Sequence, residues 1–375
     1  MIAARLPMRH HQGVHTGEEQ YRGEVPPEIR RTAGEEPDAP DGGADRARPA
    51  PAARAPGARR ARRRRVLGWC AALLLVPVSV PLAFRGADAD GPTPIPQLLA
   101  FLPWFLAPGW LALALAVLGR RWLVTVWSVL ALAATGWYIQ PYGDDAPLPR
   151  EHPPTARFRV LTANLQYGQA TEALLRTVRR ERPQLVSVQE CDTRCAAALR
   201  TPELREAYPH RVIAEDSGAG GSALLSTFPL RTAPPVHGQL SMPGAVVDIA
   251  GARVRVQVAH PMPPEPSSLG TWKRELGRLR GWAAARADSP RVLAGDFNAT
   301  QDHAAFRALL DTGLRDAARL QGQSRTPTWP TATAPPLGAQ IDHVLLSKHF
   351  EAADAQFLDL PGTDHRALLV DLTMY

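Results

Sequence analysis

Apolar residues follow two different patterns along this chain. Between residues 66 and 140 they form three nearly unbroken runs, at about 66–84, 97–118 and 122–139. Each run is close to the length of about 20 residues that a helix needs to cross a bilayer. After residue 156 the apolar runs are short, and polar or turn-forming segments separate them. The pattern predicts three transmembrane helices, a linker over 141–156 and a globular domain over 157–375.

The C-terminal region alternates between strand-like and helix-like periodicity. Strands are predicted at Phe158–Leu161, Leu185–Gln189, Val246–Ile249, Val254–Ala259, Val292–Ala294, Val344–Leu346 and Ala367–Leu372. Helices are predicted at Thr171–Arg182, Trp272–Arg286 and Asp302–Leu310. Ala250-Gly251 supplies a two-residue hairpin between the third and fourth strands. Alternating helices and strands indicate an α/β core.

The first 65 residues differ in composition from the rest. They are rich in Pro, Gly, Arg and Glu and hold few large apolar residues, so they cannot bury a core and are predicted to be disordered. This tail holds 14 Arg against 9 acidic residues and ends in Arg62–Arg65. We interpret its charge as a membrane-surface and topology signal.

The first apolar run has two interpretations. A basic segment precedes it and Ala87-Asp88-Ala89 resembles a small-residue cleavage site, as in a secretory signal peptide. Two further apolar runs and the long preceding tail favour an uncleaved anchor. Pro103 and Pro108 interrupt the second run, which a membrane helix tolerates, although they leave its ends undefined.

Arginine placement predicts the orientation of the spans. Arg62–Arg65 precede the first span and Arg120-Arg121 lie between the second and the third. The loops on the other side carry acids instead: Asp88, Asp90, Asp144 and Asp145. Because basic loops stay in the cytoplasm, we expect a multi-pass protein of the cell membrane with a cytoplasmic N-terminus and an extracytoplasmic C-terminal domain.

Six polar segments each adjoin a strand-like run. They read TANL ending at Leu165, SVQE at Glu190, QVAH at His260, GDFN at Asn298, IDH at His343 and TDH at His365. Together they are rich in hard oxygen ligands and include several histidines. Magnesium-assisted cleavage of a phosphate ester requires this combination of side chains.

The order and the amino-acid sequences of these segments resemble the motifs of the endonuclease/exonuclease/phosphatase superfamily, whose members hydrolyse phosphodiesters or phosphomonoesters. The resemblance covers roughly Arg157 to Leu372. It implies a DNase I-like α/β fold, a four-layer sandwich of two packed mixed β-sheets flanked by helices, with the active site at one end. Thr363 stands where Ser is usual and Ala367 where Pro is usual, and neither change removes a ligand.

The predicted metal site centres on Glu190. Its carboxylate follows a strand-like run, and α/β sites gather at the C-terminal ends of strands. The resemblance also places Asn164 and Asp364 near the metal, so the three form the predicted ligand set for Mg²⁺ or Mn²⁺. The alternative for Glu190 is a strand-end residue that faces solvent.

Asp296 and Asn298 lie two residues apart after another short apolar run, so both side chains can face one phosphate. The resemblance implies that Asp296 orients or deprotonates the attacking water and that Asn298 binds the phosphate. The alternative is an Asx turn that caps the helix predicted to begin near Asp302.

Three further residues complete the predicted site. A histidine that contacts a phosphate needs a partner that fixes its tautomer and stabilises its charged form. The resemblance implies that His365 contacts the phosphate, that Asp342 is its partner and that His260 is a second phosphate-binding histidine. His343 alternates to the opposite face from Asp342, so we interpret it as structural.

Several residues near these segments have two interpretations. Trp329 either lines a substrate groove or serves packing. Cys191 and Cys195 can form a local disulfide in an oxidising compartment, but the geometry is poor if both lie in one regular helix. Cys70, in the first apolar run, is interpreted as a small apolar residue.

Charge and anchoring together indicate a class of substrate. Residues 156–375 hold 25 Lys and Arg against 22 acids, whereas a dedicated DNA nuclease typically carries a strongly basic face. Nucleic acid is therefore a possible but disfavoured partner. The chain also resembles three-span actinobacterial members of the superfamily associated with glycopeptide resistance, which implies a lipid-linked phosphate or pyrophosphate of cell-wall synthesis. An extracellular nuclease, a phospholipid phosphodiesterase and a catalytically silent envelope sensor are the alternatives.

Overall fold

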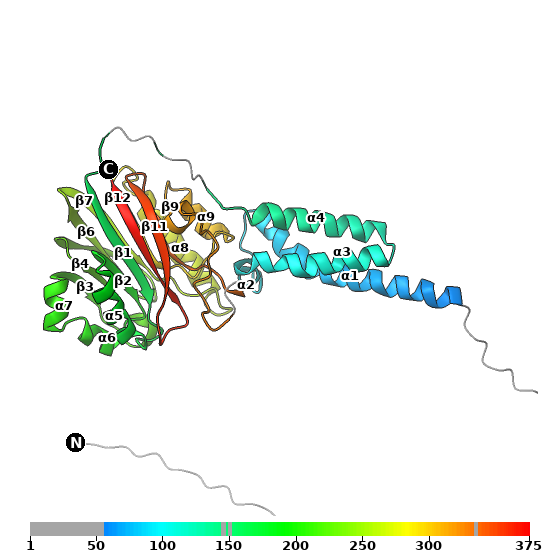
Figure 1. Cartoon of the computed structure of the whole chain (residues 1–375), viewed down its shortest axis with the longest axis horizontal. Coiled ribbons are helices and arrows are strands. Elements are labelled where there is room, and N and C mark those ends of the chain that lie inside the picture. Colours follow the sequence, from blue (N-terminus) through cyan, green and yellow to red (C-terminus); the bar gives the residue numbers. More distant parts are fainter. Residues whose placement is uncertain (1–55, 144–147, 149–151, 334–336) are drawn as a thin grey trace, which may run out of the picture. The chain divides into compact units, whose positions relative to one another are not determined.

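The computed structural model describes residues 56–143, 148, 152–333 and 337–375. Its C-terminal part is built on two six-stranded sheets, whose strands can be followed in Figure 1. The first sheet has the order β11-β12-β1-β2-β4-β3. Its strands are β1 (Ala156–Asn164), β2 (Leu185–Gln189), β3 (His210–Ala214), β4 (Ser222–Ser226), β11 (Phe350–Asp359) and β12 (Arg366–Met374).

The second sheet has the order β5-β6-β7-β8-β10-β9. Its strands are β5 (Leu230–Val236), β6 (Met242–Ile249), β7 (Ala252–Ala259), β8 (Arg291–Asp296), β9 (Arg315–Asp316) and β10 (Asp342–Leu346). Each sheet contains one parallel pair, β1 with β2 and β7 with β8, and its other pairs are antiparallel. Both sheets are therefore mixed.

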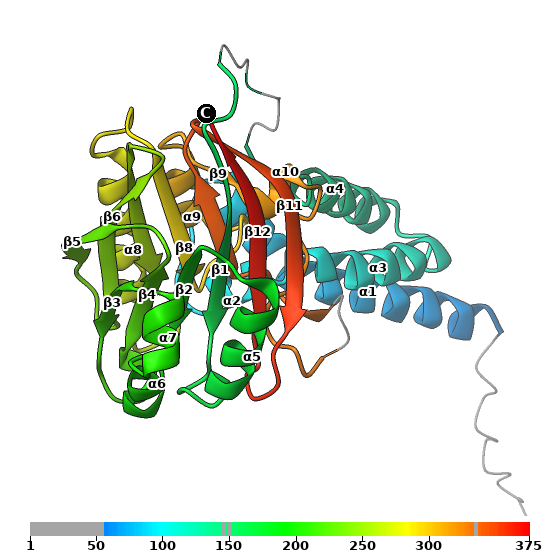
Figure 2. The same cartoon turned by 60° about the vertical axis from the view of Figure 1, so that its left-hand side comes forward.

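Helices cover the outer face of each sheet, which makes four layers (Figure 2). The first sheet is covered by α5 (Thr171–Glu181), α6 (Thr193–Ala198) and α7 (Pro202–Ala207), and the second by α8 (Leu269–Ala284) and α9 (Ala304–Leu310). A short 3-10 turn, η2 (Gly218–Gly220), and helix α10 (Ala317–Leu320) complete the region. Apolar side chains of both sheets, among them Val160 and Val256, form the central core. We call this region the sandwich.

All seven predicted strands and all three predicted helices are present in the sandwich. The predicted hairpin is confirmed, because Ile249 pairs with Ala252 and the two turn residues have positive φ angles. The prediction missed β3, β4, β5, β9 and β11. Edge strands carry a weak periodic signal: β5 contains Pro234 and Pro235, and β11 has an irregularity between Ala352 and Asp354.

The helical region before the sandwich differs from the prediction in two places. It consists of α1 (Pro56–Gly86), α2 (Ile95–Ala100), the 3-10 helix η1 (Leu102–Phe105), α3 (Leu106–Leu118) and α4 (Trp122–Tyr138). Residues 56–65, expected in the disordered tail, form the start of α1, because Ala and Arg are good helix formers. Residues 1–55 and much of the predicted linker lie outside the described residues.

The second predicted span, 97–118, is not one continuous helix. It breaks at Phe101, where the backbone leaves the α conformation, and Pro103, two residues later, lacks the amide N–H that would continue the hydrogen bonds of α2. Among the described residues, α1 is long and apolar enough to cross a membrane, whereas the apolar helices at 102–118 and 122–138 are shorter. The prediction of three full-length spans is therefore not confirmed.

Helices α1, α3 and α4 pack side by side and form a bundle with an unusual distribution of side chains. Small and polar residues lie inside it, among them Ala112, Ala116, Ser128 and Thr135. All but two of the exposed large apolar side chains among the described residues lie on these three helices. Buried Ser128 and Thr135 donate to carbonyl oxygens one turn earlier in α4, so their hydroxyls are satisfied inside the bundle.

The two arginine clusters lie at the same end of the bundle. A Cβ atom on Gly119, in the α3–α4 turn, would lie 3.0 Å from the carbonyl oxygen of Arg64, and one on Gly68 would touch the side chain of Arg121. At the opposite end, Gly86 approaches the hydroxyl of Tyr138. The chain enters the sandwich from this second end, after α4.

Candidate active site

The polar segments meet at one end of the sandwich because of the strand directions. Asn164 ends β1, Glu190 follows β2 and Asp296 ends β8. Asp342 begins β10, which is antiparallel to β8, and His365 directly precedes β12, which is antiparallel to β1. The carboxyl ends of β1, β2 and β8 and the amino ends of β10 and β12 therefore lie at the same edge of the sandwich. Asp342 pairs directly with Asp296 in the ladder between β10 and β8.

Asn164 connects the two sheets at this edge. Its amide nitrogen Nδ2 donates to Glu190 Oε1 at 3.1 Å and to Asp296 Oδ2 at 3.0 Å. Its Oδ1 accepts from the backbone N–H of Gln166, which fixes the amide orientation. In this arrangement Asn164 positions two carboxylates with its NH₂ group and does not turn its oxygen toward them.

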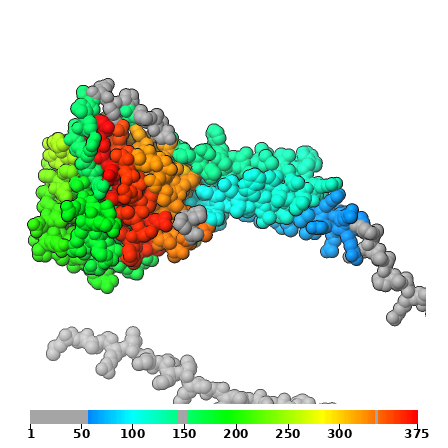
Figure 3. Space-filling model, in the orientation of Figure 1, coloured from blue at the N-terminus to red at the C-terminus, as the bar shows by residue number. Residues whose placement is uncertain are grey.

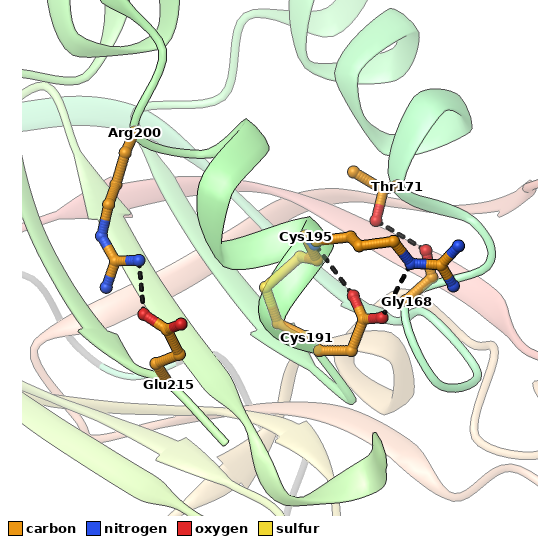
Figure 4. The surroundings of a disulfide bond; sticks show 8 residues. Gly168, Thr171, Cys191, Cys195, Arg200 and Glu215 are labelled. Carbon is orange, nitrogen blue, oxygen red and sulfur yellow. Dashed lines mark hydrogen bonds and ion pairs between the residues drawn. A yellow bond between two sulfur atoms is a disulfide. The ribbon is translucent and has the colours of Figure 1, made fainter. Parts of the chain in front are cut away.

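Glu190 is held in a sharp turn after β2. Its backbone has a φ of 54°, and Oε2 accepts from the N–H of Tyr167 at 2.8 Å. Cys191 and Cys195 form a disulfide immediately beside it (Figure 4). The bond is compatible with the fold because Cys191 lies before α6 and only Cys195 lies within it. The geometry that would have opposed a disulfide, both cysteines in one helix, does not occur.

Asp296 and Asn298 form the Asx turn that the sequence left open. Asp296 Oδ1 accepts from the N–H of Asn298 at 2.7 Å, and Asn298 has a φ of 47°. The turn does not cap a helix, since α9 begins only at Ala304. Asn298 lines the cavity while its Nδ2 donates to the carbonyl oxygen of Pro261.

His365 and Asp342 are a hydrogen-bonded pair. His365 Nδ1–H donates to Asp342 Oδ2 at 2.9 Å, and both side chains are buried. Burial lowers the pKa of His365, but the charge and hydrogen bond of Asp342 outweigh it and raise the pKa to about 9. At neutral pH the ring is therefore an imidazolium. Its Nε2 atom lies 3.9 Å from both Asp296 Oδ2 and Asp364 Oδ1.

Asp296 is the carboxylate with the most perturbed titration here. Burial, and then the negative charge of Asp342 directly across the ladder, raise the pKa of Asp296 to about 7, although His365 and the Asn298 N–H oppose the rise. A group with a pKa near neutral exchanges protons readily at neutral pH, which suits a general base.

His260 is a neutral histidine beside this pair. Burial and the nearby positive charge of His365 lower the pKa of His260 to about 3. Its buried Nδ1 makes no hydrogen bond to any described residue, and the side chain lines the cavity. A neutral ring with a free nitrogen can contact a phosphate oxygen.

Threonine hydroxyls hold the two carboxylate segments in place. Thr328 Oγ1 accepts from the N–H groups of Ile341 and Asp342, and Thr363 Oγ1 donates to Asn164 O and accepts from the N–H of His365. Thr363 therefore retains the hydroxyl contacts that Ser could make at the same position.

His343 faces away from the site, as predicted. Its Nδ1 and Nε2 both donate, to Asp316 Oδ2 at 2.6 Å and to Ala299 O at 3.0 Å, and its ring packs against Phe297 and Phe306. Burial lowers its pKa, but the Asp316 carboxylate and the hydrogen bonds outweigh this and raise the pKa overall. Its role is to connect β10, β9 and the loop after β8.

These residues open into a cavity of about 650 Å³. On one side it is lined by Glu190, His260, Asp296, Asn298, Asp364 and His365. Asp364 Oδ2 accepts from the indole N–H of Trp329 at 2.9 Å, so Trp329 lies in the wall of the groove. The sequence had left this placement undecided.

The carboxylates fit a divalent cation. Glu190, Asp296 and Asp364 present hard oxygen atoms to one cavity, and buried Asp342 Oδ1 has no partner among the described residues. Asp296, Asp342 and His365 also offer ligand atoms within 4.8 Å of one another. His365 Nδ1 and Asp342 Oδ2 already bond each other, and the carboxylates of Glu190 and Asp364 also line the cavity.

A family model described as "Endonuclease/Exonuclease/phosphatase family" matches residues 161–365, more than half of the chain. The chain belongs to the endonuclease/exonuclease/phosphatase family. It is therefore a hydrolase that acts on phosphate ester bonds, and enzymes of this family typically use a divalent metal. The curated protein sequences include no match to it.

Solved structures that are similar to this chain have low sequence identity to it and TM-scores below 0.5. D. rerio TDP2 complexed with a single-strand DNA product is 16% identical, with a TM-score of 0.48 over 58% of this chain and 99% of that chain. An endonuclease/exonuclease/phosphatase from Beutenbergia cavernae is 20% identical, with a TM-score of 0.45 over 58% and 72%. A family protein from Bacteroides thetaiotaomicron is 15% identical, with a TM-score of 0.44 over 60% and 100%.

Sequence reasoning missed one whole wall of the cavity. Gln97, Ala100 and Phe101, from the helical region, line it together with the loop that contains Met262 and Pro263. No local pattern in the sequence marks these residues, because they lie at the start of the predicted span 97–118, and an apolar run looks the same whether or not part of it faces a cavity.

Proposed function

We propose that this family member is a membrane-anchored, Mg²⁺- or Mn²⁺-dependent phosphohydrolase that acts outside the cytoplasm on a lipid-linked phosphate or pyrophosphate of cell-wall synthesis. The observation that carries the proposal is one cavity in which an imidazolium, a neutral histidine and three carboxylates converge beside a segment of the apolar helical region. This combination suits a phosphate joined to an apolar group.

The proposed chemistry follows from the atoms in the cavity. His365 Nε2–H donates to a non-bridging phosphate oxygen and stabilises the charge that develops on it. Asp342 keeps the ring charged and in the required tautomer. Asp296, which can exchange a proton near neutral pH, accepts one from the attacking water. Asn298 and His260 offer further contacts to the phosphate.

A divalent cation fits beside these groups. Glu190 and Asp364 would hold it, with Asn164 fixing the direction of the Glu190 carboxylate. The cation supplies charge neutralisation for the phosphate oxygens and the leaving oxygen.

Membrane anchoring is supported by the inverted composition of the bundle. Large apolar side chains on the outside of a helix bundle are costly in water and favourable in lipid, and small residues inside let helices approach closely. Helices α3 and α4 would reach about 20 Å and 26 Å, shorter than a hydrocarbon core of about 30 Å, so we propose that they span together with their flanking residues.

The orientation is supported by the arginines at the end of the bundle farther from the entry into the sandwich. If that end is cytoplasmic, the sandwich lies outside. Protease added to intact cells should then digest the sandwich and spare a reporter fused to the N-terminus. Protection of a C-terminal reporter after Tyr375 would contradict this orientation.

The substrate is tested by an activity screen of the full-length chain in detergent. Mg²⁺ or Mn²⁺ is added with a polyprenyl pyrophosphate, a sphingomyelin-type lipid or DNA. We expect the polyprenyl pyrophosphate to be cleaved with the highest kcat/KM. Preferential cleavage of DNA would support the nuclease alternative, and preferential cleavage of the sphingomyelin-type lipid would support the phosphodiesterase alternative. If the protein cleaves none of the three, the result would support the catalytically silent sensor.

A further inference from the structure

We infer that α2 and Phe101 form a binding subsite for the apolar chain attached to the phosphate, so that a segment outside the sandwich determines substrate specificity. The inference rests on the proposed function and extends it from the phosphate to the apolar chain that is attached to the phosphate. The subsite consists of Ala100, Phe101, Met262, Pro263 and Trp329.

This wall begins directly beside the reacting groups. The indole N–H of Trp329 donates to Asp364 at 2.9 Å, and the Trp329 ring lies 6.5 Å from the ring of Phe101, centroid to centroid. One tryptophan therefore connects a candidate metal ligand to the helical region. A chain that leaves the phosphate on this side meets aromatic and aliphatic surface at once, which favours an alkyl or prenyl group over a sugar.

The wall is fixed to the sandwich by buried polar contacts. The carboxylate of Asp90, 6% exposed, accepts from the N–H groups of Ala304 and Ala305 at 2.7 and 3.1 Å and so caps the start of α9. His303 Nε2–H donates to Pro96 O at 2.8 Å, since its Nδ1 accepts from the N–H of Thr300. These contacts hold Pro96, which directly precedes Gln97, and Asp90 in the loop that leads to it.

Further contacts tie the same segment to both sides of the cavity. Gln97 Nε2 donates to the carbonyl oxygen of Pro264, in the loop that carries Met262 and Pro263. Arg307 forms an ion pair with Asp88 at 2.5 Å, and Lys273 donates to Gly91 O at 2.8 Å. A segment held at so many points is a fixed part of the cavity and not a loosely attached linker.

The subsite is continuous with the apolar bundle. Phe101 leads through η1 directly into α3, and α3 presents Trp110, Leu111, Val117 and Leu118 on its exposed surface. Figure 3 shows the cyan helical region adjoining the orange part of the sandwich, consistent with the contacts of Asp90 and His303. A long chain bound at Phe101 can therefore continue along the outside of the bundle, where lipid would lie.

The test uses two substrates that share a reacting group. Dodecyl pyrophosphate and ethyl pyrophosphate differ only in the alkyl chain, and phosphate release is measured with the full-length chain in detergent. We expect Phe101→Ala to lower kcat/KM for dodecyl pyrophosphate about tenfold and to leave that for ethyl pyrophosphate within about twofold, because only the longer chain loses apolar contact. Phe101→Leu should retain most of the activity on the longer chain.

A second measurement does not depend on catalysis. In EDTA, radiolabelled dodecyl pyrophosphate should bind the Phe101→Ala variant about tenfold more weakly than the unmodified chain. Trp122→Ala is the matched control, since it removes an exposed aromatic side chain at the start of α4, at the end of the bundle away from the sandwich, and Trp122 does not line the cavity. The control variant should match the unmodified chain both in phosphate release and in binding of dodecyl pyrophosphate.

The outcomes separate this inference from the proposed function. If the unmodified chain does not prefer dodecyl over ethyl pyrophosphate, the proposed lipid-linked substrate is wrong, and the subsite is wrong with it. If it does prefer the longer chain, but Phe101→Ala lowers activity on both substrates equally or on neither, the lipid-linked substrate stands and the subsite is wrong.

Discussion

The sandwich and the bundle differ in how many of their large apolar side chains are exposed. In the sandwich, residues such as Leu293 and Val258 are fully buried between layers, and the surface is polar. In the bundle, alanines such as Ala112 lie inside together with Leu75 and Val78, while Leu73, Trp110 and Trp137 are 69%, 62% and 76% exposed. Large apolar side chains on the outside of a helix bundle are costly in water and favourable in lipid. The difference between the two regions therefore supports the proposal that the bundle lies in lipid while the sandwich lies in water.

The two regions also differ in where chemistry can occur. Every titratable residue of the candidate active site belongs to the sandwich, and the bundle contributes only Gln97, Ala100 and Phe101 through its adjoining segment. Variants in the sandwich should therefore change catalysis or stability, and variants on the outside of the bundle should change neither.

The largest expected effect concerns the His365–Asp342 pair. His365→Ala should lower kcat by about two to four orders of magnitude, the usual contribution of one acid–base or charge-stabilising group. Asp342→Asn should lower kcat somewhat less than His365→Ala does, because the imidazole remains but its charged form and its tautomer are no longer favoured. Since the two act as one unit, the double variant should be little worse than His365→Ala. Losses that multiply in the double variant would mean that the residues act independently.

The second effect tests the contrast between the regions through stability. Leu293→Ala, in the core of the sandwich, should lower the free energy of unfolding by about 2–5 kcal/mol, because it removes buried contacts and leaves a cavity. Leu73→Ala, on the outside of α1, should change it little. Chemical denaturation in detergent, followed by tryptophan fluorescence and circular dichroism, measures both.

Leu73→Lys sharpens the same contrast. A lysine near the middle of a membrane helix costs about 2.5–3.5 kcal/mol on insertion, so the variant should reduce the membrane-bound fraction of the protein in cells. In a bundle that faces water, the same change would be harmless. If the Leu73→Lys variant associates with the membrane as strongly as the unmodified chain, the proposal that the bundle lies in lipid is wrong.

A smaller effect is expected for the proposed metal ligand. Glu190→Gln keeps the size of the side chain and removes its charge, so the apparent affinity for Mg²⁺ should fall by roughly one to two orders of magnitude without unfolding. A titration of activity against Mg²⁺, with circular dichroism as the control for folding, tests this. An unchanged titration would assign the metal to other carboxylates.

The smallest effect is a dependence of stability on pH through His343. Its pKa is raised in the folded protein, so its contribution is fully present below the unfolded pKa of about 6.5 and is lost as pH rises through the folded pKa. Above the pH of about 6.5, the melting temperature of the unmodified chain should therefore fall more steeply with pH than that of the His343→Gln variant, by a difference on the order of a few °C. An identical pH profile for the variant and the unmodified chain would show that the His343–Asp316 pair does not contribute.

Much of the sandwich could be predicted because its signals are local. Residues 185–189 read as a buried strand and form β2 over the same range, and the Ala250-Gly251 turn appears as expected. The residues proposed for the site follow or precede such strands, so their convergence at one edge required only the strand directions. The edge strands β5 and β11 were missed because prolines and an irregular register weaken their periodicity.

Other features depend on contacts between distant residues. Asp88 and Asp90 carried only a topology signal in the sequence, yet in the fold Asp90 caps α9 and Asp88 pairs with Arg307. The break at Phe101 was suggested by Pro103, but its place in the cavity wall was not. Thr328 supports Asp342 across a separation of 14 residues that no periodic pattern reveals.

By itself, the sequence determined which chemical groups are available, which segments are strands or helices, and that one region is far more apolar than the other. These properties follow from side-chain chemistry and from periodicities of a few residues, which any stretch of chain carries with it. Only the tertiary structure decided that Asp342 lies opposite Asp296, which raises the pKa of Asp296, and that Phe101 meets Trp329 beside Asp364. Such pairings depend on the register of strands and the docking of whole elements, which the packing of the entire molecule fixes.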